Sequence, residues 1–311
     1  MFSKRKLLGF TLIILLIFAT IGCSATQTNK AEQGQNTNQI AQQSVEQSTE
    51  AFWGKTKMLK AHFIDVGQAD AILVQLPNGK NILIDGGNVD DSEDVLKYLR
   101  LQKVKKLAAI IATHPHEDHI GGLDKVILNL PVDKIYMPKV AHTSRCFEHL
   151  LKTIKQKQLK ITIPKAGQSL DFDKEIHFQV FAPNGGSYEN LNNYSIVLKI
   201  TYGKTAFLLC GDAEHVSEKE MLAKGYDLKA DVLKVAHHGS RGSSSSKFLQ
   251  AIEPRFAVVS VGKNNDYGHP HLSIIKRLQA NRVKIYRTDQ DGNIIISSDG
   301  TDLTIKTQRK Q

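Results

Sequence analysis

A short stretch, residues 113–119 (THPHEDH), concentrates side chains that bind metal ions. It directly follows an apolar run typical of a buried strand. His114 and His116 can turn to one side of an extended segment, whereas Asp118 and His119 can face a second point nearby. Imidazole with carboxylate suits zinc, or manganese and iron at a more oxygen-rich site. A polar loop that happens to be rich in histidine is the alternative, but packing gives no reason for four such side chains here. Two adjacent ions would make a two-metal hydrolytic centre.

The elements that must position this loop alternate in type along the chain. Strands are predicted at 62–66, 71–76, 81–85, 107–112, 134–137, 161–164, 176–182, 195–201, 206–210, 231–236 and 256–261, with three more closing the chain, and helices at 92–101, 123–130, 144–158, 214–224 and 272–279. Antiparallel meanders with helices between the later strands favour an α/β fold of two sheets packed face to face, with helices outside.

The first 57 residues differ from the rest of the chain. A basic cluster at residues 4–6 precedes an uncharged apolar segment at 7–22, which indicates a signal peptide over residues 1–22. Cys23 follows Gly22 as in the lipobox of bacterial lipoproteins, so we expect a lipid-anchored protein outside the cytoplasm; ordinary cleavage with secretion, or a retained anchor, is the alternative. Residues 23–57 are polar, with seven Gln after Cys23, and predict a disordered tether before one folded domain at 58–311.

Charge and cysteine content narrow the partners and the fold. The formal net charge is +10, of which residues 1–22 supply +3, and a basic surface favours polyanions such as nucleic acid, teichoic acid or anionic lipid. Only Cys146 and Cys210 remain beyond Cys23, and nothing in their spacing indicates a disulfide framework, although a bond between them stays open.

The H-x-H-x-D-H pattern resembles the defining motif of the metallo-β-lactamase-like hydrolase superfamily. That resemblance implies an αβ/βα four-layer sandwich and two divalent ions, Zn²⁺ or Mn²⁺. Asp212, at the end of an apolar strand, resembles the aspartate that bridges the two ions, although it could instead cap the next helix. His237 is chosen as the last metal ligand, and His238 is expected to contact phosphate or act as an acid. Asp85 matches the family's first motif and is expected to orient the metal loop by hydrogen bonds.

One family ligand has no counterpart in this sequence. A histidine is usual between the first motif and the bridging aspartate, but the corresponding segment, residues 191–196, reads LNNYSI. Asn192 or Asn193 is expected to take its place through an amide oxygen or a water, which would shift metal preference toward Mn²⁺.

A narrower resemblance involves four spaced motifs. The segments DVGQADA at 65–71, NNYSIVL at 192–198, HHGS at 237–240 and YGHP at 267–270 look like the metallo-β-lactamase-like domain of ComEC-type DNA-uptake proteins, without their transmembrane channel. Asp65 and Asp70 of the first motif are expected behind the metal ligands. His269 of the last motif is expected to act as a general acid or to contact phosphate.

These observations together predict an exported metal-dependent hydrolase, with Asp118, His238 and His269 as catalytic residues. The expected substrate is a phosphodiester, DNA among the candidates, attacked by metal-activated water. A lactone, a β-lactam or a teichoic-acid ester is the alternative substrate, since the same metal set serves each. A non-catalytic lipoprotein that binds extracellular DNA is the alternative of another class.

Overall fold

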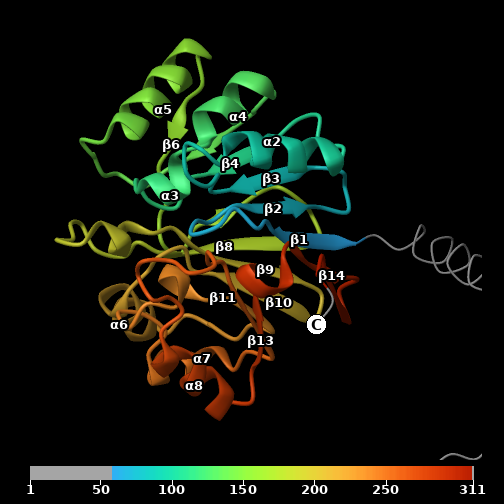
Figure 1. Ribbon diagram of the computed structural model, residues 1–311, viewed down its shortest axis with the longest axis vertical. Coiled ribbons are helices and arrows are strands. Elements are labelled where there is room, and N and C mark those ends of the chain that lie inside the picture. The colour runs from blue at the N-terminus through green and yellow to red at the C-terminus, as the bar shows by residue number, and fades with distance from the viewer. Residues whose placement is uncertain (1–57, 310–311) are drawn as a thin grey trace, which may run out of the picture. The chain divides into compact units, whose positions relative to one another are not determined.

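The computed structural model describes residues 58–309 (Figure 1). The predicted signal peptide, the expected lipidation of Cys23 and the predicted tether lie outside the described residues. Within residues 58–309, no helix combines the length and the apolar character that crossing a membrane requires. These residues belong to one compact unit, Thr56–Gln311.

Two mixed sheets form the centre of this unit. The first has eight strands in the order β15-β14-β1-β2-β3-β4-β5-β6, and the second has seven in the order β13-β12-β11-β10-β9-β8-β7. The strands are β1 (Leu59–Phe63), β2 (Ile72–Gln75), β3 (Asn81–Ile84), β4 (Ala109–Ile111), β5 (Ile135–Tyr136), β6 (Ile161–Thr162), β7 (Ser169–Leu170), β8 (Ile176–Ala182), β9 (Val197–Tyr202), β10 (Thr205–Leu209), β11 (Val232–Lys234), β12 (Phe256–Val259), β13 (Lys284–Arg287), β14 (Ile294–Ser298) and β15 (Leu303–Thr307).

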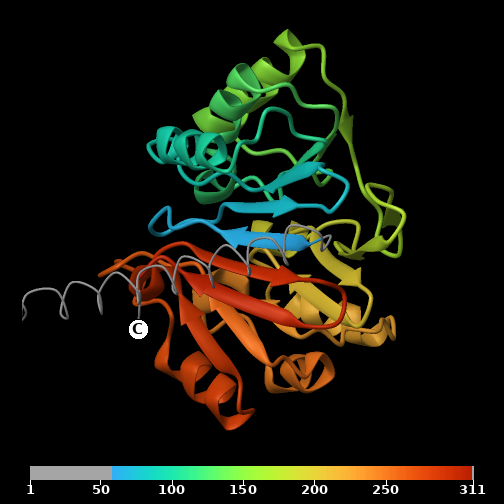
Figure 2. The ribbon, with the colours of Figure 1, turned by 90° about the vertical axis from the view of Figure 1, so that its right-hand side faces the viewer.

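Helices cover the outer face of each sheet. Figures 1 and 2 show α2, α4 and α5 on the outside of the first sheet, and α6, α7 and α8 on the outside of the second. The helices are α2 (Ser92–Leu101), α3 (Glu117–Ile120), α4 (Leu123–Asn129), α5 (Arg145–Gln156), α6 (His215–Ala223), α7 (Ser246–Ile252), α8 (Leu272–Ala280) and α9 (Thr288–Asp291), with the short 3-10 helices η1 (Leu191–Tyr194) and η2 (Ala236–Gly239).

Three apolar layers hold this arrangement together. One cluster fills the space between the sheets and includes Phe63, Phe178 and Phe207, each with no exposed surface. A second packs α2, α4 and α5 on the first sheet, and a third packs α6, α7 and α8 on the second. The predicted αβ/βα four-layer sandwich is therefore confirmed. Cys146 and Cys210 are both buried and free, so they form no disulfide.

The sheets are more parallel than the sequence suggested. β3, β4, β5 and β6 run parallel, and so do β10, β11, β12 and β13. Parallel strands place their carboxyl ends at one edge of a sheet, and ligands usually bind at that edge in open α/β sheets. The loops after β3, β4, β10, β11 and β12 carry most of the polar residues singled out above, while Asp65 and Asp70 follow β1, and Asn192 and Asn193 follow β8.

Candidate metal centre

The loop after β4 is fixed from behind by Asp85, at the end of β3. One carboxylate oxygen of Asp85 accepts the backbone N–H of Thr113 at 2.8 Å, and the other accepts the Thr113 hydroxyl and Nδ1–H of His119, both at 2.7 Å. Because Nδ1 of His119 is used in this way, Nε2 is left facing the centre. The structure thus places Asp85 behind the metal-type residues.

The glycine pair after His119 allows this loop to lie against its neighbour. A Cβ on Gly122 would stand 2.3 Å from the carbonyl oxygen of Gly86, and one on Gly121 would stand 2.4 Å from the backbone nitrogen of Val89. The backbone N–H of Gly86 also donates to the carbonyl of His119 at 2.7 Å. Only glycine fits at this close approach.

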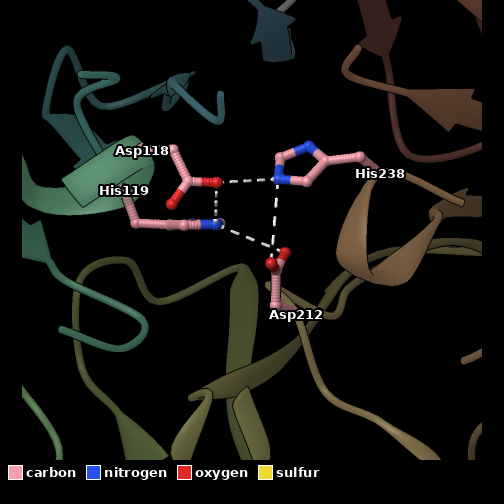
Figure 3. Close-up of side chains that lie close together, drawn as sticks. All are labelled: Asp118, His119, Asp212 and His238. Carbon is pink, nitrogen blue, oxygen red and sulfur yellow. Dashed lines mark hydrogen bonds and ion pairs between the residues drawn. The ribbon is translucent and has the colours of Figure 1, made fainter. Parts of the chain in front are cut away.

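Four side chains from three loops meet at the centre (Figure 3). Nε2 of His119 lies 3.5 Å from Asp118 Oδ2 and 3.3 Å from Asp212 Oδ1. Nε2 of His238 lies 3.1 Å from Asp118 Oδ2 and 3.7 Å from Asp212 Oδ2. All four ligand atoms fall within 4.8 Å of one another, so these residues could hold one metal ion.

His238 belongs to this group, although the sequence had suggested His237 as the ligand and His238 as an acid or a phosphate contact. Nδ1–H of His238 donates to the carbonyl of Ser260 at 2.8 Å, which leaves Nε2 for the centre. Both histidines have left-handed backbone, with φ of 49° at His237 and 51° at His238. In a strand two successive side chains would point to opposite faces, but with this backbone both rings reach the site.

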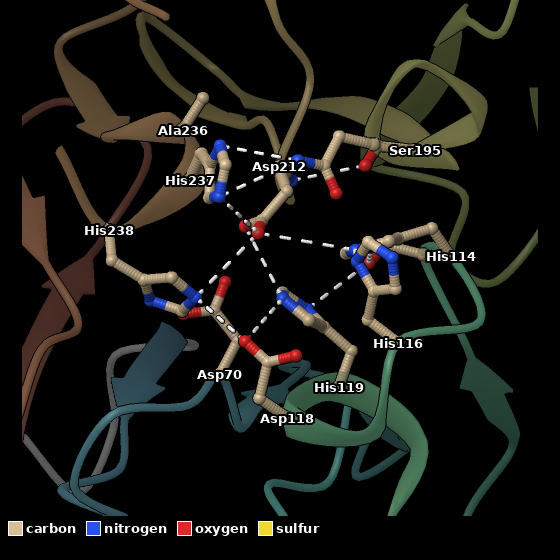
Figure 4. Close-up of polar contacts among 12 residues, drawn as sticks. Asp70, His114, His116, Asp118, His119, Ser195, Asp212, Ala236, His237 and His238 are labelled. Carbon is tan, nitrogen blue, oxygen red and sulfur yellow. Dashed lines mark hydrogen bonds and ion pairs between the residues drawn. The ribbon is translucent and has the colours of Figure 1, made fainter. Parts of the chain in front are cut away.

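A second group of ligand atoms lies on the other side of Asp212 (Figure 4). Oδ2 of Asp212 is 4.0 Å from Nε2 of His114 and 3.8 Å from Nε2 of His237. Nδ1 of His116 lies 3.0 Å from Nε2 of His114, and Nδ1–H of His237 donates to Glu214 at 2.9 Å. These atoms are not drawn together within 4.8 Å as those of the first group are, and Asp212 lies between the two groups.

His237 therefore lies with His114 and His116 beside Asp212, where it could stand in for the family histidine that this sequence lacks. Asn193 is committed elsewhere, because its Oδ1 accepts the backbone N–H groups of Glu214 at 3.3 Å and Ser217 at 3.2 Å at the start of α6. Asn192 lies closer to these histidines, with its amide nitrogen 3.2 Å from Nδ1 of His237. Its buried Oδ1 has no hydrogen-bond partner among the described residues.

The two acidic residues of the β1–β2 loop have different positions. Asp70 is buried, forms an ion pair with the buried Lys234 at 2.7 Å, and lies 3.6 Å from Nδ1 of His238. Asp65 was expected behind the ligands, but the structure places it elsewhere: its carboxylate pairs with Arg309 at 2.9 Å, and its backbone N–H donates to Asn293. The pairing of β14 with β1, and of β15 with β14, explains this difference.

A pocket of about 330 Å³ opens onto the centre. It is lined by Gln68, His116, Glu117, Asp118, Asp212, His237, His238, Tyr267 and His269. The ring of His269 lies 5.5 Å from that of His237 and 6.4 Å from that of His238, between centroids. Burial, together with the neighbouring histidines, lowers the pKa of His269 to about 4.

The electrostatics of the centre favour a cation. Burial alone would raise the pKa of Asp212, but His119 and His238 hold it well below its usual value. Burial likewise opposes the charged form of His119, yet the carboxylates of Asp212 and Asp118 raise its pKa well above the usual value. Burial lowers the pKa of His114 well below 6.5, and metal ligation requires that neutral form.

The residues present fit a metal centre by a further criterion. Nε2 of His119 and Oδ1 of Asp212 are buried and have no hydrogen-bond partner among the described residues. Buried polar atoms without partners are costly, and a cation placed between them would satisfy both.

Several residues of the site escaped the sequence argument. Glu214 orients His237, and Lys234 pairs with Asp70 beneath His238. Ser195 accepts the backbone N–H of Asp212 at 3.0 Å. The only signal in the sequence was their nearness to the motifs, since Glu214 follows Asp212 by two residues.

Comparison with known proteins agrees with this geometry. The family model of the Metallo-beta-lactamase superfamily matches residues 64–263. The chain is 34% identical over 248 residues to ComE operon protein 3 of Bacillus subtilis, covering 74% of this chain and 32% of that protein. It is 30% identical over 240 residues to Recombination protein 2 of Haemophilus influenzae, covering 75% and 28%. It thus spans about a third of the length of these relatives. The resemblance to ComEC-type competence proteins is confirmed.

A solved structure with a similar fold is CmlA, a diiron beta-hydroxylase from Streptomyces venezuelae. The TM-score is 0.50 at 14% identity, over 74% of this chain and 52% of that chain. At this identity the likeness concerns the fold alone.

Proposed function

The chain belongs to the metallo-beta-lactamase superfamily of metal-dependent hydrolases, and we propose that its substrate is a phosphodiester, most specifically that of DNA. The observation that carries this proposal is the position of Asp212 between two groups of ligand atoms. Two ions held side by side suit the displacement at phosphorus, where both attacking and leaving oxygens develop charge. The net charge of +10 and the names of the relatives, a competence-operon protein and a recombination protein, support a nucleic-acid substrate.

Each residue of the centre has a defined part in this proposal. Asp118, His119 and His238 would hold one ion. His114, His116 and His237 would hold the other, with Asp212 shared. When bound, divalent ions such as Zn²⁺ or Mn²⁺ lower the pKa of water and offset negative charge on the phosphate.

The remaining polar groups orient this set. Asp85 holds the ring of His119, Ser260 holds that of His238, and Glu214 holds that of His237, each through Nδ1–H. His269 lines the same pocket and, with its lowered pKa, is neutral at neutral pH. A neutral imidazole N–H there can donate to a phosphate or leaving-group oxygen.

The experiment that tests this function joins metal analysis with turnover. Purified protein is assayed for bound metal, then for cleavage of bis-p-nitrophenyl phosphate and single-stranded DNA with Mn²⁺ or Zn²⁺. Asp118→Ala is expected to abolish turnover, because it removes one ligand atom of the group formed with His119, Asp212 and His238. Asp133→Ala is the matched control, since its carboxylate is half exposed and pairs with Lys106 on the surface. Bound metal without phosphodiester turnover would refute the substrate, and absence of metal would refute the hydrolase.

We also propose that the protein is exported and anchored to the membrane through a lipid on Cys23, on the sequence pattern given above. The polar segment behind Cys23 would then hold the domain away from the membrane surface. Cell fractionation tests this: Cys23→Ser should move the protein out of the membrane fraction, and a protein that stays in that fraction would count against the anchor.

A further inference from the structure

The pocket that opens onto the candidate metal centre has an exposed aromatic ring in its lining. Tyr267 lines the same pocket as Asp118 and His238, and 68% of its surface is exposed. Among the exposed large hydrophobic residues of the described part, it has the greatest exposed fraction, and the others are aliphatic. Tyr267 belongs to none of the three apolar clusters of the described residues, so packing does not account for its position.

The loop that carries Tyr267 is held in one conformation. Asn265 donates from its amide nitrogen to the carbonyls of Gly262 at 2.9 Å and His269 at 2.7 Å, and its oxygen accepts the backbone N–H of His269 at 3.0 Å. The backbone N–H of Gly262 donates to Gln68, which also lines the pocket. These bonds hold the backbone on both sides of Tyr267.

The ring continues a series of near-parallel planes that starts at the metal centre. The rings of His238 and His269 are 22° from parallel with centroids 6.4 Å apart, and those of His269 and Tyr267 are 23° from parallel with centroids 5.6 Å apart. His269 thus supports one face of Tyr267, and the exposed fraction of Tyr267 leaves the other side open to a ligand.

We propose that Tyr267 is a stacking platform for a nucleobase of the substrate, next to the phosphate that is cleaved. This inference rests on the proposed phosphodiesterase function and narrows its substrate to single-stranded nucleic acid or to a strand end, since a base inside a duplex is already stacked. An aromatic ring recognises any base by its flat face, so the platform predicts little sequence preference. Removal of one such ring weakens binding by about tenfold.

The first test measures binding, so that it does not depend on turnover. The full chain, in a chelating buffer that keeps strands intact, is titrated with a labelled single strand and with a matched strand that lacks bases. Wild type should bind the strand with bases about tenfold more tightly, Tyr267→Ala should lose this difference, and Tyr267→Phe should keep it. Leu101→Ala is the control, because Leu101 is similarly exposed at 66% on α2.

The second test separates this inference from the proposed function. With Mn²⁺ present, Tyr267→Ala should raise KM for a single-stranded oligonucleotide about tenfold and leave kcat unchanged. Equal preference for bases in wild type and Tyr267→Ala overturns the platform, even if wild type cleaves DNA. Loss of that preference in Tyr267→Ala supports the platform, even if cleavage is never observed. If Tyr267→Ala loses binding to a glycosylated polyol phosphate but binds DNA as wild type does, the platform for a nucleobase is overturned and Tyr267 would instead stack on a sugar.

Discussion

Replacement of Lys234 by methionine should destabilise the fold far more than an ordinary lysine substitution. Lys234 has no exposed surface and Asp70 has 1%, and their charged atoms are 2.7 Å apart. Methionine keeps most of the volume but leaves the Asp70 carboxylate buried without its cation. Breaking a buried pair in this way costs about 3–5 kcal/mol, which would raise the unfolding equilibrium constant by about a hundredfold or more.

The assay is equilibrium unfolding in urea, with chelator present so that metal binding does not contribute. Lys199→Met is a matched control, because Lys199 pairs with Asp227 at a similar 2.8 Å but the Asp227 side chain is 76% exposed. That pair should contribute no more than about 1 kcal/mol. The double variant Lys234→Met/Asp70→Asn should recover part of the loss, since no unpaired charge remains. Equal losses for Lys234→Met and Lys199→Met would refute this reasoning.

Two other predictions follow from single positions. Gly122→Ala should lower the free energy of unfolding in urea by about 1–3 kcal/mol, because its Cβ would stand 2.3 Å from the Gly86 carbonyl oxygen. Gly186→Ala is the control and should be nearly neutral, since a Cβ there meets nothing within 4 Å. Equal effects of the two substitutions would contradict the close approach. Burial, with Lys60 nearby, lowers the pKa of His62 to about 4 in the folded protein. As pH falls, His62 therefore binds a proton in the unfolded chain before it does so in the folded one, which favours unfolding. Between pH 7 and 5 wild type should lose about 2 kcal/mol more stability than His62→Gln, and parallel pH profiles would exclude this role.

Local patterns predicted the parts of the fold that depend on neighbours in the sequence. α2 at Ser92–Leu101 and β8 at Ile176–Ala182 have the predicted bounds, because a helical period and the alternation of apolar and polar residues are both written in consecutive residues. The two-residue strand β7 and the short helix α9 were not predicted. Their few residues carry no period, and pairing with a neighbouring strand or loop is what orders them.

The same division applies to the site. The residues of the 113–119 loop were recognisable because their metal-binding side chains are close together in the sequence, and Asp212 was recognisable from its resemblance to the bridging aspartate of the family. That His237 and His238 both face the centre was not predicted, because two successive residues with positive φ break the alternation that a strand would impose. Contacts such as Glu214 with His237 depend on how η2 packs against the start of α6, which no short pattern encodes.

The order of strands in the first sheet has a consequence for how the chain reaches its final state. β1 lies between β2 and β14, so the first strand of the domain pairs with one formed near the end of the chain. While the chain is being made, one side of β1 has open N–H and C=O groups until residues 294–298 arrive. Such an edge readily pairs with other chains. Loss of the last two strands should therefore cause self-association of nascent protein even though the 113–119 loop and Asp212 are complete by then.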